Sequence, residues 1–254
     1  MQTIPKLLIA MTLAGLALAG GLRAEDKPAV DPVAMKALDR MGEYLRTLKT
    51  FTLHANDTRD EVLESGQNIQ FSGTVDLEVR SPDRLHADIQ TDRKSRQMFF
   101  DGKNFTLYAP KVKFYASVPT SATTIGGILD NIENKYGIEF PLVDIFRWGV
   151  DPCDARDIKA AMQVGPSRIN GQLTDHYAFR QKGLDWQIWI ARGDAPLPLR
   201  YVINTLDEPG EPQYTVNLSW DTTTKVDDPR FTFTPGKDDH RIEILALDAK
   251  QPVK

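Results

Sequence analysis

Cysteine is nearly absent from this 254-residue chain, in which Cys153 is the single example. A lone cysteine cannot form an intramolecular disulfide, so the fold must be stabilised by its own hydrophobic core. Such a residue is either a reactive nucleophile or a small buried hydrophobic side chain. No set of catalytic partner residues surrounds Cys153 in the sequence, so we favour the buried, structural role.

Sequence motifs for catalysis, cofactors and metals are also missing. The four histidines are scattered and show no metal-ligand spacing. Ser167 follows Gly165 but lacks the second glycine of a nucleophile elbow, and there is no phosphate loop or dinucleotide fingerprint. The sequence therefore predicts no catalytic residue, no metal and no cofactor. Because acidic residues are many and dispersed, an envelope hydrolase with paired carboxylates stays open as the least favoured alternative.

No apolar run in the chain reaches the roughly 20 residues that a membrane-spanning helix needs. The apolar run over residues 7–19 follows Lys6 at the N-terminus and is followed by small residues. This is the pattern of a secretory signal peptide, with plausible cleavage after Ala19 or Ala24. We therefore expect residues 1–24 to be removed on export.

A strong charge of either sign is absent as well. Removing residues 1–24 takes away Lys6 and Arg23 but no acid, so the net charge changes from −4 to −6. This mild acidity argues against nucleic acid as a partner. No Pro/Gly/Ser-rich linker or internal repeat divides the remaining chain, so we expect a single domain over residues 25–254.

Strict alternation of apolar and polar residues distinguishes residues 69–80. It predicts a β-strand with one apolar and one polar face. At about 3.3 Å per residue, this strand is much longer than usual. Long twisted strands curl, and Gly73 is a natural bending point. The apolar face is therefore expected to be concave.

Further alternating segments follow through short turns and predict about ten strands in an antiparallel meander. Helical spacing is present over residues 32–49, 125–136 and 141–148, and a further helix is expected over 154–162. Asp31 is the expected N-cap of the first of these helices, and Gly137 is the expected C-terminal cap of the second. Because these helices interrupt a β protein, we expect them to cover one face of the sheet. The predicted fold class is α+β, a strongly curved antiparallel sheet with helices packed in its concave face.

Several segments carry a more specific signal, namely residues 81–85, 101–108, 114–119, 136–142 and 228–233. Together they resemble a family of predicted periplasmic bacterial proteins of unknown function. That family is similar in its order of elements to the periplasmic lipoprotein-carrier (LolA/LolB-like) superfamily. The resemblance implies an open half-barrel whose cavity receives acyl chains of lipoproteins or lipids. It also implies an alternative, because a relative in that superfamily binds partner proteins to sense envelope stress.

The sequence thus predicts a non-catalytic periplasmic binder or carrier of an acyl chain, lipid or lipoprotein. Binding would be driven by burial of alkyl groups, at about 0.8 kcal/mol per methylene. A regulatory protein that binds an envelope membrane protein is the alternative, and a core filled by its own helices would leave no ligand site. Chosen by face and period, the candidate ligand-binding residues are Phe71, Val75, Leu77, Phe105, Leu107, Ile125, Ile128, Leu129, Ile132, Trp186 and Ile188.

Overall fold

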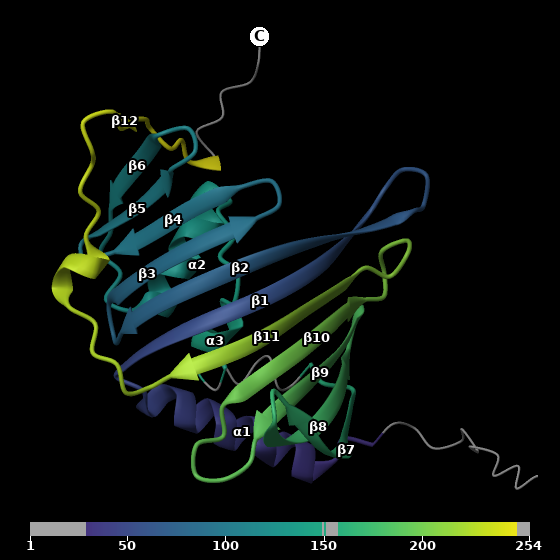
Figure 1. Cartoon of the computed structure of the whole chain (residues 1–254). Helices are drawn as coiled ribbons and strands as arrows, with labels where there is room; N and C mark the ends of the chain where they lie inside the picture. The colour runs from purple at the N-terminus through teal and green to yellow at the C-terminus, as the bar shows by residue number, and fades with distance from the viewer. Residues whose placement is uncertain (1–28, 149, 151–156, 248–254) are drawn as a thin grey trace, which may run out of the picture.

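A computed structural model describes residues 29–148, 150 and 157–247 of the chain. Over these residues, twelve strands form one sheet in the order β12-β6-β5-β4-β3-β2-β1-β11-β10-β9-β8-β7. Neighbouring strands are antiparallel except β12 and β6, which are parallel. The sheet is strongly curved and open, because β12 and β7 lie at its two ends (Figure 1). The predicted α+β half-barrel is confirmed.

The longest strands, β1 and β2, pair along their whole length at the centre of the sheet (Figure 1). The strands are β1 (Thr50–Val62), β2 (Asn68–Arg80), β3 (Arg84–Thr91), β4 (Ser95–Phe100), β5 (Asn104–Ala109), β6 (Phe114–Pro119), β7 (Ala160–Ile169), β8 (Gln172–Gln181), β9 (Leu184–Ala191), β10 (Pro198–Thr205), β11 (Gln213–Asp221) and β12 (His240–Arg241). The helices are α1 (Pro32–Thr47), α2 (Ile125–Tyr136), α3 (Asp144–Arg147) and the 3-10 helix η1 (Asp228–Phe231).

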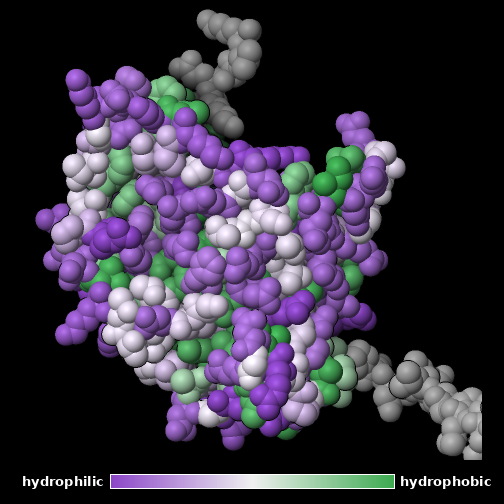
Figure 2. All heavy atoms as spheres, viewed as in Figure 1, coloured by the Kyte–Doolittle hydropathy of each residue, from purple (hydrophilic) through white to green (hydrophobic). Residues whose placement is uncertain are grey.

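Alternation along β2 separates a core face from a solvent face, as the sequence predicted. Val75, Leu77 and Val79 are buried, whereas their neighbours on the other face are partly or fully exposed. Figure 2 views the convex side of the sheet, where hydrophilic residues predominate. The apolar side chains therefore gather on the concave side.

The helices cover this concave side. In Figure 1, α2 and α3 lie behind the sheet and α1 runs across its lower end. The side chain of Asp31 caps α1 by accepting a hydrogen bond from the Val33 N–H, and α2 ends at Gly137 in a left-handed conformation. Both helix boundaries agree with the sequence signals. Met41 of α1 and Ile128 of α2 join the strands in one core.

Two of the helices predicted from the sequence have the wrong bounds. Over residues 141–148 only α3 is helical, because Leu142 adopts a left-handed backbone with φ 64° that interrupts the segment. In the helix predicted over 154–162, Ala160–Met162 instead begin β7 and pair with β8. A short apolar run does not distinguish a helix from a strand, and here pairing with β8 decides. Cys153, residues 154–156 and the leader over residues 1–24 lie outside the described residues.

The segment after β11 returns over the convex face and ties strands together. Arg230 of η1 donates to both carboxylate oxygens of Glu78 on β2 at 2.8–3.1 Å. The ring of Phe233 packs against Tyr108 and Tyr115, with centroids 4.8 and 5.0 Å apart. The segment then adds β12 to the edge of β6. β7, which the sequence analysis did not predict as a strand, and the two-residue β12 bring the sheet to twelve strands.

Anchoring of α1 can be tested with a pair of alanine substitutions. Met41 is fully buried, whereas Val33 in the same helix is 52% exposed. We expect Met41→Ala to lower the free energy of unfolding by about 2–5 kcal/mol, because it removes core packing and leaves a cavity. Val33→Ala should change it by no more than about 0.5 kcal/mol. Urea titration measures both, and equal small effects would contradict a core that includes α1.

Candidate functional site

The concave face changes from apolar to polar along β1. Leu53 and Ala55 are buried in the core, and the next residues on the same face are Asp57, Arg59 and Glu61. Side chains two residues apart on a strand share a face, so the polar residues continue the apolar row directly. The concave side therefore has an apolar end beneath the helices and a polar end beyond them.

A cavity of about 440 Å³ lies where these two ends meet. β1 and β2 form its floor, the β3–β4 hairpin forms one wall, and β10 with β11 forms the other. Residues 139–144, which join α2 to α3, form the roof. Its volume is within the range of small-molecule sites in proteins. Apolar and aromatic side chains make up much of the lining, including Phe71, Ile89, Met98, Leu142, Ile203 and Tyr214.

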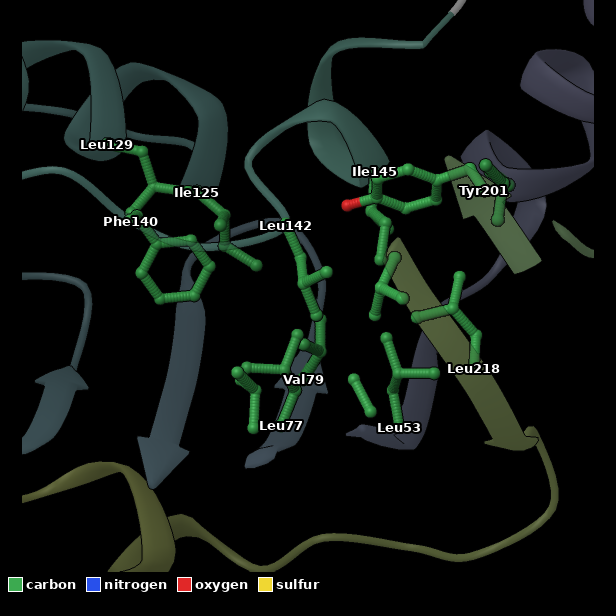
Figure 3. Packing of buried hydrophobic residues seen from close by; sticks show 14 of the residues in the cluster. Leu53, Leu77, Val79, Ile125, Leu129, Phe140, Leu142, Ile145, Tyr201 and Leu218 are labelled. Atoms are coloured by element: carbon green, nitrogen blue, oxygen red, sulfur yellow. The ribbon is translucent and has the colours of Figure 1, made fainter. Parts of the chain in front are cut away.

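The roof closes the inner end of the cavity with two apolar side chains. Phe140 and Leu142 are buried, and Figure 3 shows Leu142 pointing from the connection between α2 and α3 toward Val79 of β2. The left-handed backbone of Leu142 costs about 1–2 kcal/mol for a residue other than glycine. Burial of its side chain offsets this cost, so the roof is held by packing.

Asp57 is a buried carboxylate on β1, two residues before Arg59 of the cavity lining. The residue is 4% exposed, and its Oδ2 atom is 3.6 Å from Nη2 of Arg59 but accepts no hydrogen bond within the described part of the chain. Burial raises the pKa of Asp57, and the positive charge of Arg59 partly offsets this effect. Gly73 lies opposite on β2, where a Cβ atom would come within 2.6 Å of Asp57 Oδ1. Glycine at this position therefore leaves room for the carboxylate.

Two buried tyrosines, on β10 and β11, also line the cavity. Tyr201 and Tyr214 are hydrogen-bonded to each other, and their ring centroids are 5.9 Å apart. Burial raises the pKa of both phenols, and the carboxylates of Asp57 and Asp144 raise them further. Both tyrosines are therefore neutral at physiological pH, so they offer hydrogen bonds and apolar ring surface.

The candidate ligand-binding residues fall in different places. Phe71 lines the cavity. Leu107 and Trp186 are partly buried and pack against the core. The remaining candidates are buried in the core that the sheet and α2 form together: Val75, Leu77, Phe105, Ile125, Ile128, Leu129, Ile132 and Ile188. The structure thus brings all of them to the concave side but only Phe71 to the cavity.

Histidine–carboxylate pairs on the convex face were not predicted from the sequence. His54 Nδ1 is 2.6 Å from Asp76 Oδ1, and His86 Nδ1 is 2.9 Å from Glu78 Oε2. Each pair joins directly opposite residues of neighbouring strands, so it becomes visible only when the register is known. Within the described ranges, no group of three or more His, Cys, Asp or Glu residues is placed to hold a metal ion. No helix among these residues is long and apolar enough to span a bilayer.

Residues 34–245 match the model of a protein family described as "Predicted periplasmic protein (DUF2092)". This match covers most of the chain, so the protein belongs to the DUF2092 family. The match confirms both the family resemblance and the periplasmic localisation expected from the sequence. Among proteins with curated functions, none matches the chain in sequence.

Several solved structures are similar to the chain at low sequence identity. Lipoprotein LppX of Mycobacterium tuberculosis is 14% identical, with 78% of this chain and 100% of that chain covered and a TM-score of 0.49. An uncharacterised conserved protein from Thermus thermophilus is 13% identical, with 83% and 99% covered and a TM-score of 0.47. A LolA superfamily protein from Nitrosomonas europaea is 10% identical, with 79% and 97% covered and a TM-score of 0.40. Similarities of this size carry no information about ligand or activity.

Removing the buried charge of Asp57 should stabilise the protein at neutral pH. The pKa of this carboxyl is raised above its unfolded value of about 3.9. The folded chain therefore holds the Asp57 proton up to a higher pH than the unfolded chain does. The stability gained from this tighter proton binding is complete below the unfolded pKa and is lost as pH rises through the folded pKa. We expect Asp57→Asn to raise the free energy of unfolding at pH 7 and to lose this advantage toward pH 4. Urea titrations across this range measure the difference, and a pH-independent difference would contradict the assignment.

Proposed function

We propose that this periplasmic protein binds the apolar chain of a lipid or lipoprotein without covalent chemistry and acts as its binder or carrier. The observation that supports the proposal most strongly is the cavity of about 440 Å³ on the concave side. Its floor adjoins the apolar part of the concave face, its walls carry Ile89, Met98 and Ile203, and its roof buries Phe140 and Leu142.

An alkyl chain suits this cavity better than a polar solute does. Each methylene moved from water to the apolar lining contributes about 0.8 kcal/mol. Phe71 and Ile89 offer aromatic and aliphatic contacts from the neighbouring strands β2 and β3, and Ile203 offers an aliphatic contact from β10, on the other side of β1 and β11. A chain lying across them would touch both halves of the half-barrel.

Access to the inner part of the cavity would require movement of the roof. Helix α2 is a poor candidate for a moving lid, because Ile125, Ile128 and Leu129 are all packed in the core. The roof over residues 139–144 inserts fewer buried side chains, and one of them sits on a left-handed backbone. We therefore assign the moving part to this connection and a fixed role to α2.

A filling substitution tests the cavity as the binding site. Ile203 is partly exposed on the cavity wall, so Ile203→Trp should occupy ligand space while preserving the apolar lining. We expect it to weaken binding of a BODIPY-labelled fatty acid by about tenfold or more, which corresponds to about 1.4 kcal/mol. Binding is measured by fluorescence titration, with circular dichroism to verify folding.

Val164→Trp is the matched control. Val164 is 50% exposed on the edge strand β7 and does not line the cavity, so this variant should bind like the wild type. Wild-type affinity in a folded Ile203→Trp protein would contradict the cavity as the site.

The alternatives predict different results in further experiments. A protein that binds an envelope membrane partner would retain that partner in a pull-down and release no lipid on extraction with organic solvent. An envelope hydrolase would turn over ester or glycoside substrates. The carrier proposal predicts that mass spectrometry of the solvent extract detects an alkyl-chain compound and that neither substrate class is hydrolysed.

A further inference from the structure

The charged side chains at the cavity differ in how well they are neutralised. Arg59 is 3.6 Å from the buried carboxylate of Asp57. Arg93 is 3.0 Å from Glu61, and its guanidinium group also lies 4.0 Å from the centroid of the Phe71 ring. Each of these two arginines thus has a carboxylate of its own.

Arg96 and Lys94 are in a different situation. Arg96 is half-buried on β4 and lies opposite Ile89, so it faces the concave side next to the apolar lining. Lys94 is exposed in the turn between β3 and β4, on the same wall of the cavity. Neither side chain forms an ion pair or hydrogen bond with another residue in the described part of the chain. A half-buried charge without a partner is costly, because it loses water without gaining a counter-charge.

Four acidic residues line the cavity, Glu61, Asp92, Glu139 and Asp144, and none of them forms an ion pair with Arg96 or Lys94 in the described part of the chain. Glu61 is engaged by Arg93. Asp92 accepts a hydrogen bond from the Ser72 N–H at 2.8 Å. Glu139 is exposed on the roof and forms no ion pair with Arg96 among the described residues. The wall formed by the β3–β4 hairpin therefore carries two cationic side chains without an ion-pair partner in the part of the chain that the structure describes, close to the apolar side chains of Phe71 and Ile89.

We infer that the ligand is an anionic amphiphile, whose carboxylate or phosphate group binds Arg96 and Lys94. Its alkyl chain then lies over Phe71 and Ile89, beneath Leu142. The planar fork of a guanidinium group suits the paired oxygens of carboxylate and phosphate, and the ammonium group adds a point charge at the rim. This inference rests on the proposed function and adds the charge of the ligand.

The headgroup preference can be measured with ligands of equal chain length. Laurate, dodecyl phosphate, dodecanol and dodecyltrimethylammonium compete below their micelle concentrations with a neutral fluorescent alkyl probe. We expect the two anions to bind about tenfold more tightly than dodecanol, since hydrogen bonds to charged groups are the stronger ones. The cation should bind more weakly than dodecanol. Added salt should reduce the differences in affinity between the anionic, neutral and cationic ligands, because Arg96 and Lys94 lie near solvent.

Substitutions of Arg96 and Lys94 test whether these residues cause the preference for an anionic headgroup. Arg96→Gln should weaken laurate binding by about tenfold and leave dodecanol binding within about twofold of the wild type. Lys94→Gln should weaken laurate binding by about threefold, because an exposed charge is screened by water and salt. Arg168→Gln changes an exposed arginine on β7 away from the cavity and should change neither ligand.

The possible outcomes separate this inference from the proposed function. If dodecanol binds but Arg96→Gln leaves laurate binding unchanged, the charge inference is wrong and the apolar binding site stands. If none of the alkyl ligands displaces the probe, the proposed function itself fails. If inorganic phosphate alone competes as well as dodecyl phosphate, the site binds an anion without a chain and the amphiphile inference is wrong.

Discussion

The structure depends on keeping one face of an open sheet away from water. Leu53 and Leu77 are opposite each other at the centre of that face and are almost inaccessible to solvent. A closed barrel would bury such a face against itself, but here the two end strands stay apart. Helices α1, α2 and α3 must therefore provide the cover. The cavity lies where this cover thins to a single connection, residues 139–144.

Much of the fold follows from local sequence signals. The alternation in β2 predicted the apolar face, because a strand directs successive side chains to opposite sides. Caps at Asp31 and Gly137 predicted the start of α1 and the end of α2. The helix predictions over residues 141–148 and 154–162 were wrong because of the tertiary structure. The left-handed backbone of Leu142 shortens α3, and pairing with β8 makes Ala160–Met162 part of a strand.

The candidate site was less accessible to sequence analysis. Face and period placed Phe71 and Leu129 on the same apolar surface, yet Phe71 lines the cavity and Leu129 fills the core. Periodicity does not reveal which part of a face a helix covers. One signal was present in the sequence, because Asp57 and Arg59 continue the alternating positions of Phe51, Leu53 and Ala55 with charged residues. Among the described residues, Arg59 and Arg93 have carboxylate partners, whereas Arg96 and Lys94 do not. This difference depends on distances between side chains of neighbouring strands, which no sequence pattern encodes.

The central claim is that an alkyl chain occupies the space between the sheet and residues 139–144. Photolabelling with a diazirine-bearing fatty acid, followed by peptide mapping with mass spectrometry, tests this most directly. The account predicts labels on residues 139–144 and on cavity-facing positions of β2, β10 and β11, with competition by unlabelled laurate. Labels confined to the convex face, or labels that laurate does not compete away, would contradict it.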